Sequence, residues 1–188
     1  MGKLLVVSHP EVVVEPETPI AEWGLSEIGR ARAHTFAQSQ TMSCVTDIWS
    51  STERKASETA AILAKRLGLV AKSEPGLGEN DRSATGFLPP SIFESAADTF
   101  FGAPNSSFRG WETAHAAQLR IVQTVLSIGK NHDGRDLAIV THGAVGTLLW
   151  CHLAGKEIDR RFDQSGQGHF WRADIKTLQP EFGWRPIA

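Results

Sequence analysis

Short apolar runs rich in branched side chains alternate with longer amphipathic stretches along this chain. The runs predict strands buried on both faces, and the stretches predict helices. Their alternation predicts an α/β fold, a three-layer α/β/α sandwich in which helices cover both faces of a mostly parallel sheet. The predicted strands are 3–8, 44–50, 69–72 and 137–142 with a terminal pair at 169–173 and 178–182, and the predicted helices are 25–40, 52–67, 91–100, 111–131 and 144–153.

The segment 74–110 differs from the rest of the chain because it shows little sustained period and is rich in Gly, Pro, Ser and Phe. A long segment of this kind is typical of a lid or substrate loop. Its phenylalanines indicate either an apolar portion of the ligand or anchoring of the loop to the core. We expect residues 1–188 to form one domain with this lid inside it.

Composition and charge exclude several classes of protein. The 19 basic and 21 acidic residues give a net charge of −2, and the absence of long basic runs argues against nucleic-acid binding. No run approaches the ~18 apolar residues of a membrane span. Both cysteines lie in apolar stretches, which predicts buried thiols in a reduced, cytoplasmic protein.

Three residues suited to anion chemistry, His9, Arg54 and His142, each follow one of the predicted strands. The carboxyl ends of parallel strands meet at one edge of a sheet, where ligands bind. Any one of these residues alone is more often structural. All three at strand ends predict an anion site that contains a nucleophile.

The sequence at 50–60, Ser-Ser-Thr-Glu-Arg-Lys-Ala-Ser-Glu-Thr-Ala, opens a predicted helix directly after a strand. Together with His9 and the segment 141–143, Thr-His-Gly, it resembles the histidine phosphatase superfamily, also called the phosphoglycerate mutase-like family. Similar segments follow in family order, with Leu-Ser-Glu-Ile-Gly at 25–29, Leu-Gly-Glu at 77–79 and Arg-Gly-Trp-Glu at 109–112. The resemblance spans most of residues 4–150 and implies the fold of that family.

The resemblance implies that His9 is the nucleophile, which forms a phosphohistidine that water then cleaves. A neutral imidazole suits this role because it is nucleophilic near neutral pH. Arg54 carries over as the clamp on the phosphoryl oxygens, and His142 as a second donor to them. The helix that begins at Gly143 adds backbone N–H groups to the same anion site. No metal and no organic cofactor are implied.

Glu79 matches the family's proton donor to the leaving oxygen. It must be protonated to act, which requires a raised pKa near the bound anion. Asp81, close by in the sequence, is the reserve choice for this role.

The chain departs from the family at its first motif, where Arg-His-Gly is replaced by Ser8-His9-Pro10. Loss of one preorganised donor costs roughly 10²–10³ in rate, and Pro10 also removes a backbone N–H. We expect Ser8 to line the pocket. Arg82 is the first candidate to replace the missing guanidinium, and Arg160 and Arg161 are weaker candidates.

Three functions stay open at this point. The favoured one is hydrolysis of phosphomonoesters through a phosphohistidine on His9. The second is a catalytically impaired phosphate-binding or regulatory protein on the same fold, and the third is a mutase-type phosphotransferase. In each case the expected partner is a small phosphorylated substrate or inorganic phosphate, with no nucleic acid and no membrane. The sequence does not specify the oligomeric state.

Overall fold

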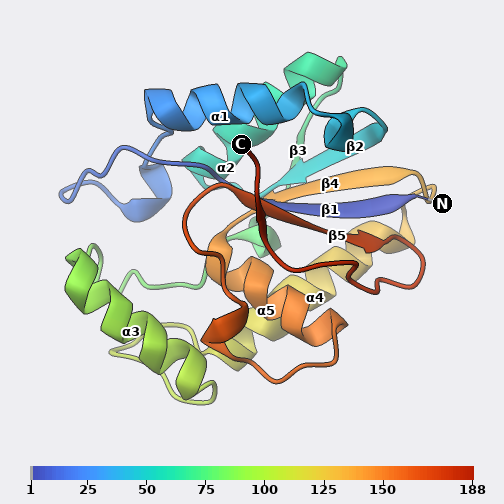
Figure 1. Cartoon of the computed structure of the whole chain (residues 1–188). Helices are drawn as coiled ribbons and strands as arrows, with labels where there is room; N and C mark the ends of the chain where they lie inside the picture. Colours follow the sequence, from blue (N-terminus) through green and yellow to red (C-terminus); the bar gives the residue numbers. More distant parts are fainter. Residues whose placement is uncertain (1) are drawn as a thin grey trace.

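The computed structural model describes residues 2–188, and in them six strands form one sheet in the order β3-β2-β4-β1-β5-β6 (Figure 1). The first four strands in this order run parallel, whereas β5 pairs antiparallel with β1 and β6 with β5. The prediction of a mostly parallel sheet is therefore confirmed. The strands are β1 (Lys3–Ser8), β2 (Val45–Ser50), β3 (Lys72–Ser73), β4 (Asp136–Thr141), β5 (His169–Asp174) and β6 (Arg185–Pro186).

Helices cover both faces of the sheet, as the three-layer prediction requires (Figure 1). Two helices, α1 and α2, lie on one face, and α4 and α5 lie on the other, while α3 stands apart from these layers. The helices are α1 (Glu27–Ala37), α2 (Arg54–Leu67), α3 (Pro90–Gly102), α4 (Ala114–Lys130) and α5 (Gly143–Leu153). Among residues 2–188, none of these helices combines the length and the apolar character needed to cross a membrane.

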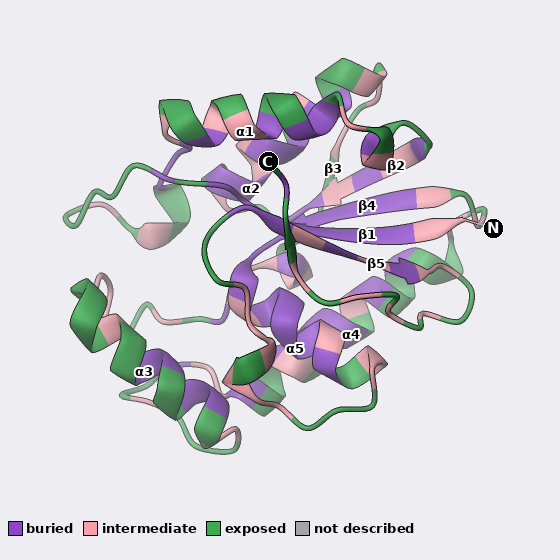
Figure 2. Ribbon diagram, viewed as in Figure 1, coloured by how far each residue is buried: buried purple, intermediate pink, exposed green. Residues whose placement is uncertain are grey.

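The central strands are apolar at successive positions because both of their faces are covered, as Figure 2 shows. Along β1, Leu4 and Val6 belong to the core under α4 and α5, whereas Leu5 and Val7 belong to the core under α1 and α2. Each such side chain stabilises the fold by about 1.5–3 kcal/mol when it is fully buried. This double burial explains the continuous apolar runs that predict the strands.

Two predicted strands are placed differently by the structure. The chain at 69–72 forms only Lys72–Ser73, because helix α2 closes with Gly68 at φ 68° and with the Leu69 N–H donating to the carbonyl of Ala64 (2.9 Å). Such a C-terminal cap uses the residues that the pattern assigned to the strand.

The predicted strand 178–182 was wrong. The segment makes only an isolated bridge from Pro180 to Ala173, and β6 pairs with β5 instead. The Asp174 carboxylate accepts the N–H groups of Lys176 and Thr177, which turns the chain tightly, and Pro180 has no N–H to offer a ladder.

The segment 74–110 contains α3 and lies at the end of the sheet where the parallel strands terminate (Figure 1). Phe100 and Phe101 are 2 % exposed and pack into the core, so they anchor the segment. Phe87 contacts Trp23, with ring centroids 5.9 Å apart, and thereby joins the segment to the loop that follows β1. This end of the sheet is thus enclosed by two parts of the chain.

Candidate active site

A cavity of about 340 Å³ opens beside His9, beyond the carboxyl ends of the central strands. His9 follows β1 and His142 follows β4, and because these strands are parallel neighbours the two rings meet edge to face with centroids 5.3 Å apart. The charged or amide side chains that line the cavity are those of Lys55, Glu79, Asn80, Arg82, Glu94, Arg160, Asp163, Gln164 and Gln167.

The hydrogen bonding of His9 identifies its protonation state. Its Nδ1 lies 2.9 Å from the carbonyl oxygen of Pro10. A carbonyl only accepts, so Nδ1 carries the hydrogen and Nε2 keeps its lone pair. Burial lowers the pKa of His9 to about 4, although the hydrogen bond to Pro10 opposes this. The ring is therefore neutral near neutral pH.

His142 is fully buried beside His9 and does not line the cavity, contrary to the expectation that it donates to the phosphoryl oxygens. Its Nε2 lies 2.9 Å from the Ser51 hydroxyl and 3.3 Å from Oε1 of Glu53. Burial lowers the pKa of His142 well below its usual value, and the charge of Glu53 opposes this. Its Nδ1 has no hydrogen-bond partner among residues 2–188.

Glu79 lies in the cavity at the start of α5. Its carboxyl oxygens accept the backbone N–H groups of Val145 (3.2 Å) and Ala144 (3.4 Å). Burial raises the pKa of Glu79, and the charge of Arg82 opposes the rise. A raised pKa is what a proton donor requires. The helix that begins at Gly143 was expected to offer its N–H groups to the phosphoryl anion. In the structure, the N–H groups that follow Gly143 bind Glu79 instead.

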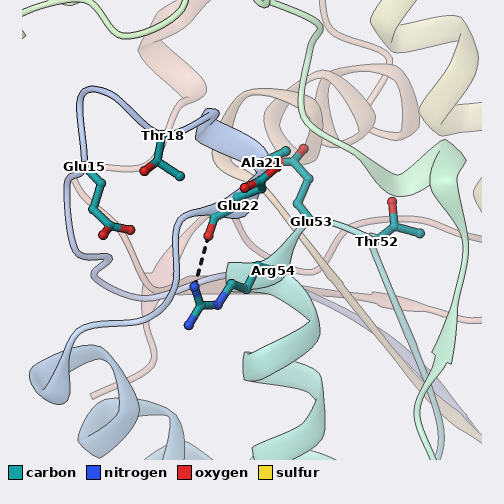
Figure 3. A pocket seen from close by; sticks show the side chains of 7 residues that line it. All are labelled: Glu15, Thr18, Ala21, Glu22, Thr52, Glu53 and Arg54. Carbon is teal, nitrogen blue, oxygen red and sulfur yellow. Dashed lines mark hydrogen bonds between the residues drawn. The ribbon is translucent and has the colours of Figure 1, made fainter.

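Arg54 is not brought to the cavity, contrary to the expectation that it clamps a phosphoryl group. Its side chain is 57 % exposed, its Nε donates to Glu58 (2.9 Å) and its guanidinium reaches the carbonyl of Glu22 (3.4 Å). Figure 3 shows it pointing into a separate pocket, beside the loop that carries Glu15. Of the three residues expected at one anion site, the structure brings His9 and His142 together and leaves Arg54 outside.

The next residue, Lys55, takes the position expected for Arg54. Its side chain is 3 % exposed and lines the cavity, and its Nζ donates to the carbonyl of Ile20 (2.8 Å) and to Glu53. The sequence carried a signal for this, since Ala56, Thr59 and Ala60 mark the buried stripe of the helix and Lys55 lies on it.

Glu53 is a functional candidate that the sequence reasoning missed. One oxygen pairs with Lys55, while the other accepts the backbone N–H of Glu79 (2.8 Å) and faces His142. Burial acts against ionisation, but the charges of His142 and Lys55 and the hydrogen bonds from Lys55 and the Glu79 N–H lower the pKa of Glu53 to about 2. This charged carboxylate contacts three other members of the site.

Ser8 is fully buried and does not line the cavity, which corrects the expectation for it. Its hydroxyl donates to the side-chain carbonyl of Gln164 and accepts the N–H of His169 (3.0 Å). The Gln164 amide forms the cavity wall instead. A Cβ at Gly143 would lie 2.5 Å from Nε2 of Gln164, so glycine is needed for this approach. Gln164 sits in an irregular loop, where no sequence pattern marks it.

The expected residues Arg82 and Asp81 differ in whether they line the cavity. Arg82 lines the cavity with its guanidinium 4.9 Å from the ring centre of Phe93, as expected of a replacement cation. Asp81 is exposed outside the cavity wall, and hydrogen bonds from Ser83 lower its pKa, which does not suit an acid.

The two weaker candidates, Arg160 and Arg161, also differ. Arg160 lines the cavity but pairs with Glu94 and Asp98, and Arg161 lies over the ring of Phe162 at 4.7 Å. Among residues 2–188, no group of three or more His, Cys, Asp or Glu side chains is arranged to hold a metal ion.

Comparison with known families gives one match. The sequence model of the histidine phosphatase superfamily (branch 1) matches residues 17–172, which begins after His9. A search of curated proteins finds no match.

Solved structures share the fold at low sequence identity. A mycobacterial glucosyl-3-phosphoglycerate phosphatase has a TM-score of 0.82 at 19 % identity, with 100 % of both chains covered. Its complex with inorganic phosphate has a TM-score of 0.77 at 20 % identity, covering 98 % of this chain and 95 % of that one. An Entamoeba histolytica phosphoserine phosphatase mutant bound to phosphoserine has a TM-score of 0.78 at 18 % identity, covering 100 % and 98 %.

Proposed function

This chain belongs to the histidine phosphatase superfamily, and from this premise we propose that it hydrolyses phosphomonoesters through a phosphohistidine on His9. The observation that carries the proposal is the state of the His9 ring. Its Nδ1 hydrogen is held by the Pro10 carbonyl and burial keeps the ring neutral, so Nε2 is available as a nucleophile. The cations Lys55 and Arg82 line the same cavity.

The reaction has two steps. In the first, Nε2 of His9 attacks phosphorus, the bond from phosphorus to the ester oxygen breaks, and protonated Glu79 gives its proton to the leaving alcohol. In the second, water attacks the phosphohistidine and gives a proton to the Glu79 carboxylate. Phosphate leaves, and His9 is neutral again. The raised pKa of Glu79 suits both directions of proton transfer.

The phosphoryl group is held by Lys55, Arg82 and the Gln164 amide. Lysine is a compact point charge, whereas arginine offers a planar fork that binds two oxygens at once. The site therefore grips phosphate less firmly than one with two guanidinium groups. Segment 74–110, which supplies Arg82 and α3, acts as the wall that covers the leaving group.

A phosphate-binding protein with little turnover is the second candidate. It is favoured by the absence of an arginine at position 8 and by the ion pair of Lys55 with Glu53, which reduces the positive charge available to a transition state. Both candidates predict binding of inorganic phosphate, and they differ in covalent chemistry.

The test is to incubate the protein with an aryl phosphate, quench in base, and look for one phosphoryl group on His9 by mass spectrometry. His9→Ala is expected to lose both the adduct and the turnover, while the exposed His115→Ala keeps both. No turnover beside retained phosphate binding favours the second candidate. If the native protein neither hydrolyses the ester nor binds phosphate, both candidate functions are overturned.

A further inference from the structure

The cavity has an apolar half that the proposed chemistry does not use. Trp23 from the loop after β1, Phe93 and Ala97 from α3, and Trp111 are among its lining residues. Phe93 is half-buried, so part of it stays accessible beside the Arg82 guanidinium, which lies 4.9 Å from the ring centre, whereas the other three are buried. A group of matching apolar character gains free energy there by leaving water.

Positive charge in the cavity is scarce. Three cations line it, but Lys55 is paired with Glu53, and Arg160 is paired with Glu94 and Asp98. Among residues 2–188, Arg82 is the cavity cation that makes no ion pair.

Carboxyl groups also line the cavity, and Asp163 accepts hydrogen bonds from Thr147 of α5 (2.8 Å) and from the Gln164 N–H (2.8 Å). Glu94 and Asp163 line it together with the apolar residues. A dianionic phosphoryl group already uses the cation that is free, and any further anion on the substrate would face carboxyl groups and aromatic rings. Uncompensated charge in such surroundings is costly.

Resting on the proposed function, we infer that the substrate is a phosphomonoester whose leaving group is apolar and carries no negative charge. Phe93 is the residue that selects the apolar group. The Arg160–Glu94–Asp98 cluster is what withholds a second cation from the substrate.

The first experiment compares kcat/KM for benzyl phosphate and phosphoglycolate. Both are esters of primary alcohols, so they differ chiefly in an apolar ring against a carboxylate. We expect at least about tenfold preference for benzyl phosphate, the effect of burying one ring. Equal rates overturn the inference and leave the proposed function standing. No turnover of either ester, with no phosphohistidine formed, overturns the proposed function and the inference with it.

The second experiment removes the Phe93 ring. Phe93→Ala is expected to lower the ratio of benzyl phosphate to phosphoglycolate about tenfold. The neighbouring, exposed Ile92→Ala is the control and leaves the ratio unchanged. Because the Arg82 guanidinium lies over the Phe93 ring, the Ki of inorganic phosphate is measured for each variant and separates a loss of phosphate binding from a loss of the apolar contact. An unchanged ratio in Phe93→Ala overturns the role of that ring.

The third experiment frees Arg160. Glu94→Gln combined with Asp98→Asn leaves that guanidinium unpaired in the cavity wall, and we expect relative activity on phosphoglycolate to rise about fivefold. Glu27→Gln combined with Asp133→Asn makes the same change in net charge at exposed positions remote from the cavity. A rise of equal size in both double variants would mean that total charge, and not Arg160, sets the preference.

Discussion

Two hollows lie on either side of the start of helix α2, and they differ in burial more than in size. The pocket around Arg54 has a volume of about 580 Å³, and its guanidinium is largely exposed (Figure 3). The cavity beside His9 measures about 340 Å³, yet it holds the buried Lys55 and the half-buried Glu79. Burial shifts the pKa values of His9 and Glu79 in the smaller hollow, because desolvation raises the cost of charge. Size alone does not locate chemistry.

Two adjacent residues at the start of α2 face the two different hollows. Successive residues of a helix point about 100° apart, so Arg54 faces solvent and Lys55 faces the cavity. Glu53, just before them, touches both hollows: it lines the outer pocket and its carboxylate holds Lys55.

The strongest test of the difference between the two hollows is to replace Lys55 and Arg54 one at a time. Lys55→Ala is expected to lower kcat/KM on an aryl phosphate by roughly 10²–10³, the effect of losing one preorganised donor to the transition state. Arg54→Ala is expected to stay within about twofold, because its exposed pair with Glu58 contributes little. Steady-state kinetics and the Ki of inorganic phosphate measure both.

Lys55→Ala also leaves Glu53 buried without its partner, so the fold must be checked by circular dichroism. Lys55→Arg keeps the charge and serves as the folded counterpart. A large loss in Arg54→Ala, with Lys55→Ala active, would reverse the assignment of the two hollows.

The second test compares a carboxyl group inside the cavity, that of Glu79, with the exposed one of Asp81. Glu79→Gln is expected to lower turnover of benzyl phosphate about 10²-fold, because a poor leaving group needs a proton. The loss is smaller for nitrophenyl phosphate, whose leaving group departs as an anion. Asp81→Asn is the matched control and is expected to change neither rate. Equal losses on both esters would mean that Glu79 acts through the start of α5 and not as an acid.

Much of the fold was readable from the sequence because double burial produces continuous apolar runs. The strands that carry His9 and His142 were found in this way, and their parallel pairing brings the rings together. Elements at the sheet edges were harder to predict. The last pair of strands depends on turn contacts of Asp174, which hydrophobic patterning does not report.

The site was partly readable for a related reason. Glu79 and Arg82 follow a recognisable segment and do line the cavity. Arg54 was assigned from the family resemblance as the arginine of its motif, whereas the helical period decides which of two neighbours is buried. Gln164 was missed because its position depends on a contact with Ser8 across 156 residues of sequence.

The third test uses pH, which acts on His9 in the buried hollow. The His9 pKa is about 4 in the folded protein against an ordinary value of 6.5. The folded state therefore binds fewer protons between these values, and the free energy of unfolding rises with pH across this window. The free energy of unfolding reaches its full value above about pH 6.5. It falls by up to roughly 3 kcal/mol as the pH falls toward 4.

Urea unfolding of native protein and His9→Gln at several pH values measures this effect. The glutamine variant lacks the titrating group, so the difference in unfolding free energy between the two proteins should change over this pH range. A constant difference would mean that His9 titrates normally and is not desolvated in the cavity.

The smallest effect is expected at Gln164, the cavity residue to which the Ser8 hydroxyl donates. Gln164→Ala removes the amide that lines the cavity, and we expect the Ki of inorganic phosphate to rise by about threefold to tenfold, the value of one hydrogen bond. Gly143→Ala should act in the same direction, because its new Cβ displaces Nε2 of Gln164. The exposed Gln179→Ala is the control for loss of an amide. If Gln164→Ala binds phosphate as the native protein does, the amide only fills space beside Ser8, and the cavity grips its anion through Lys55 and Arg82 alone.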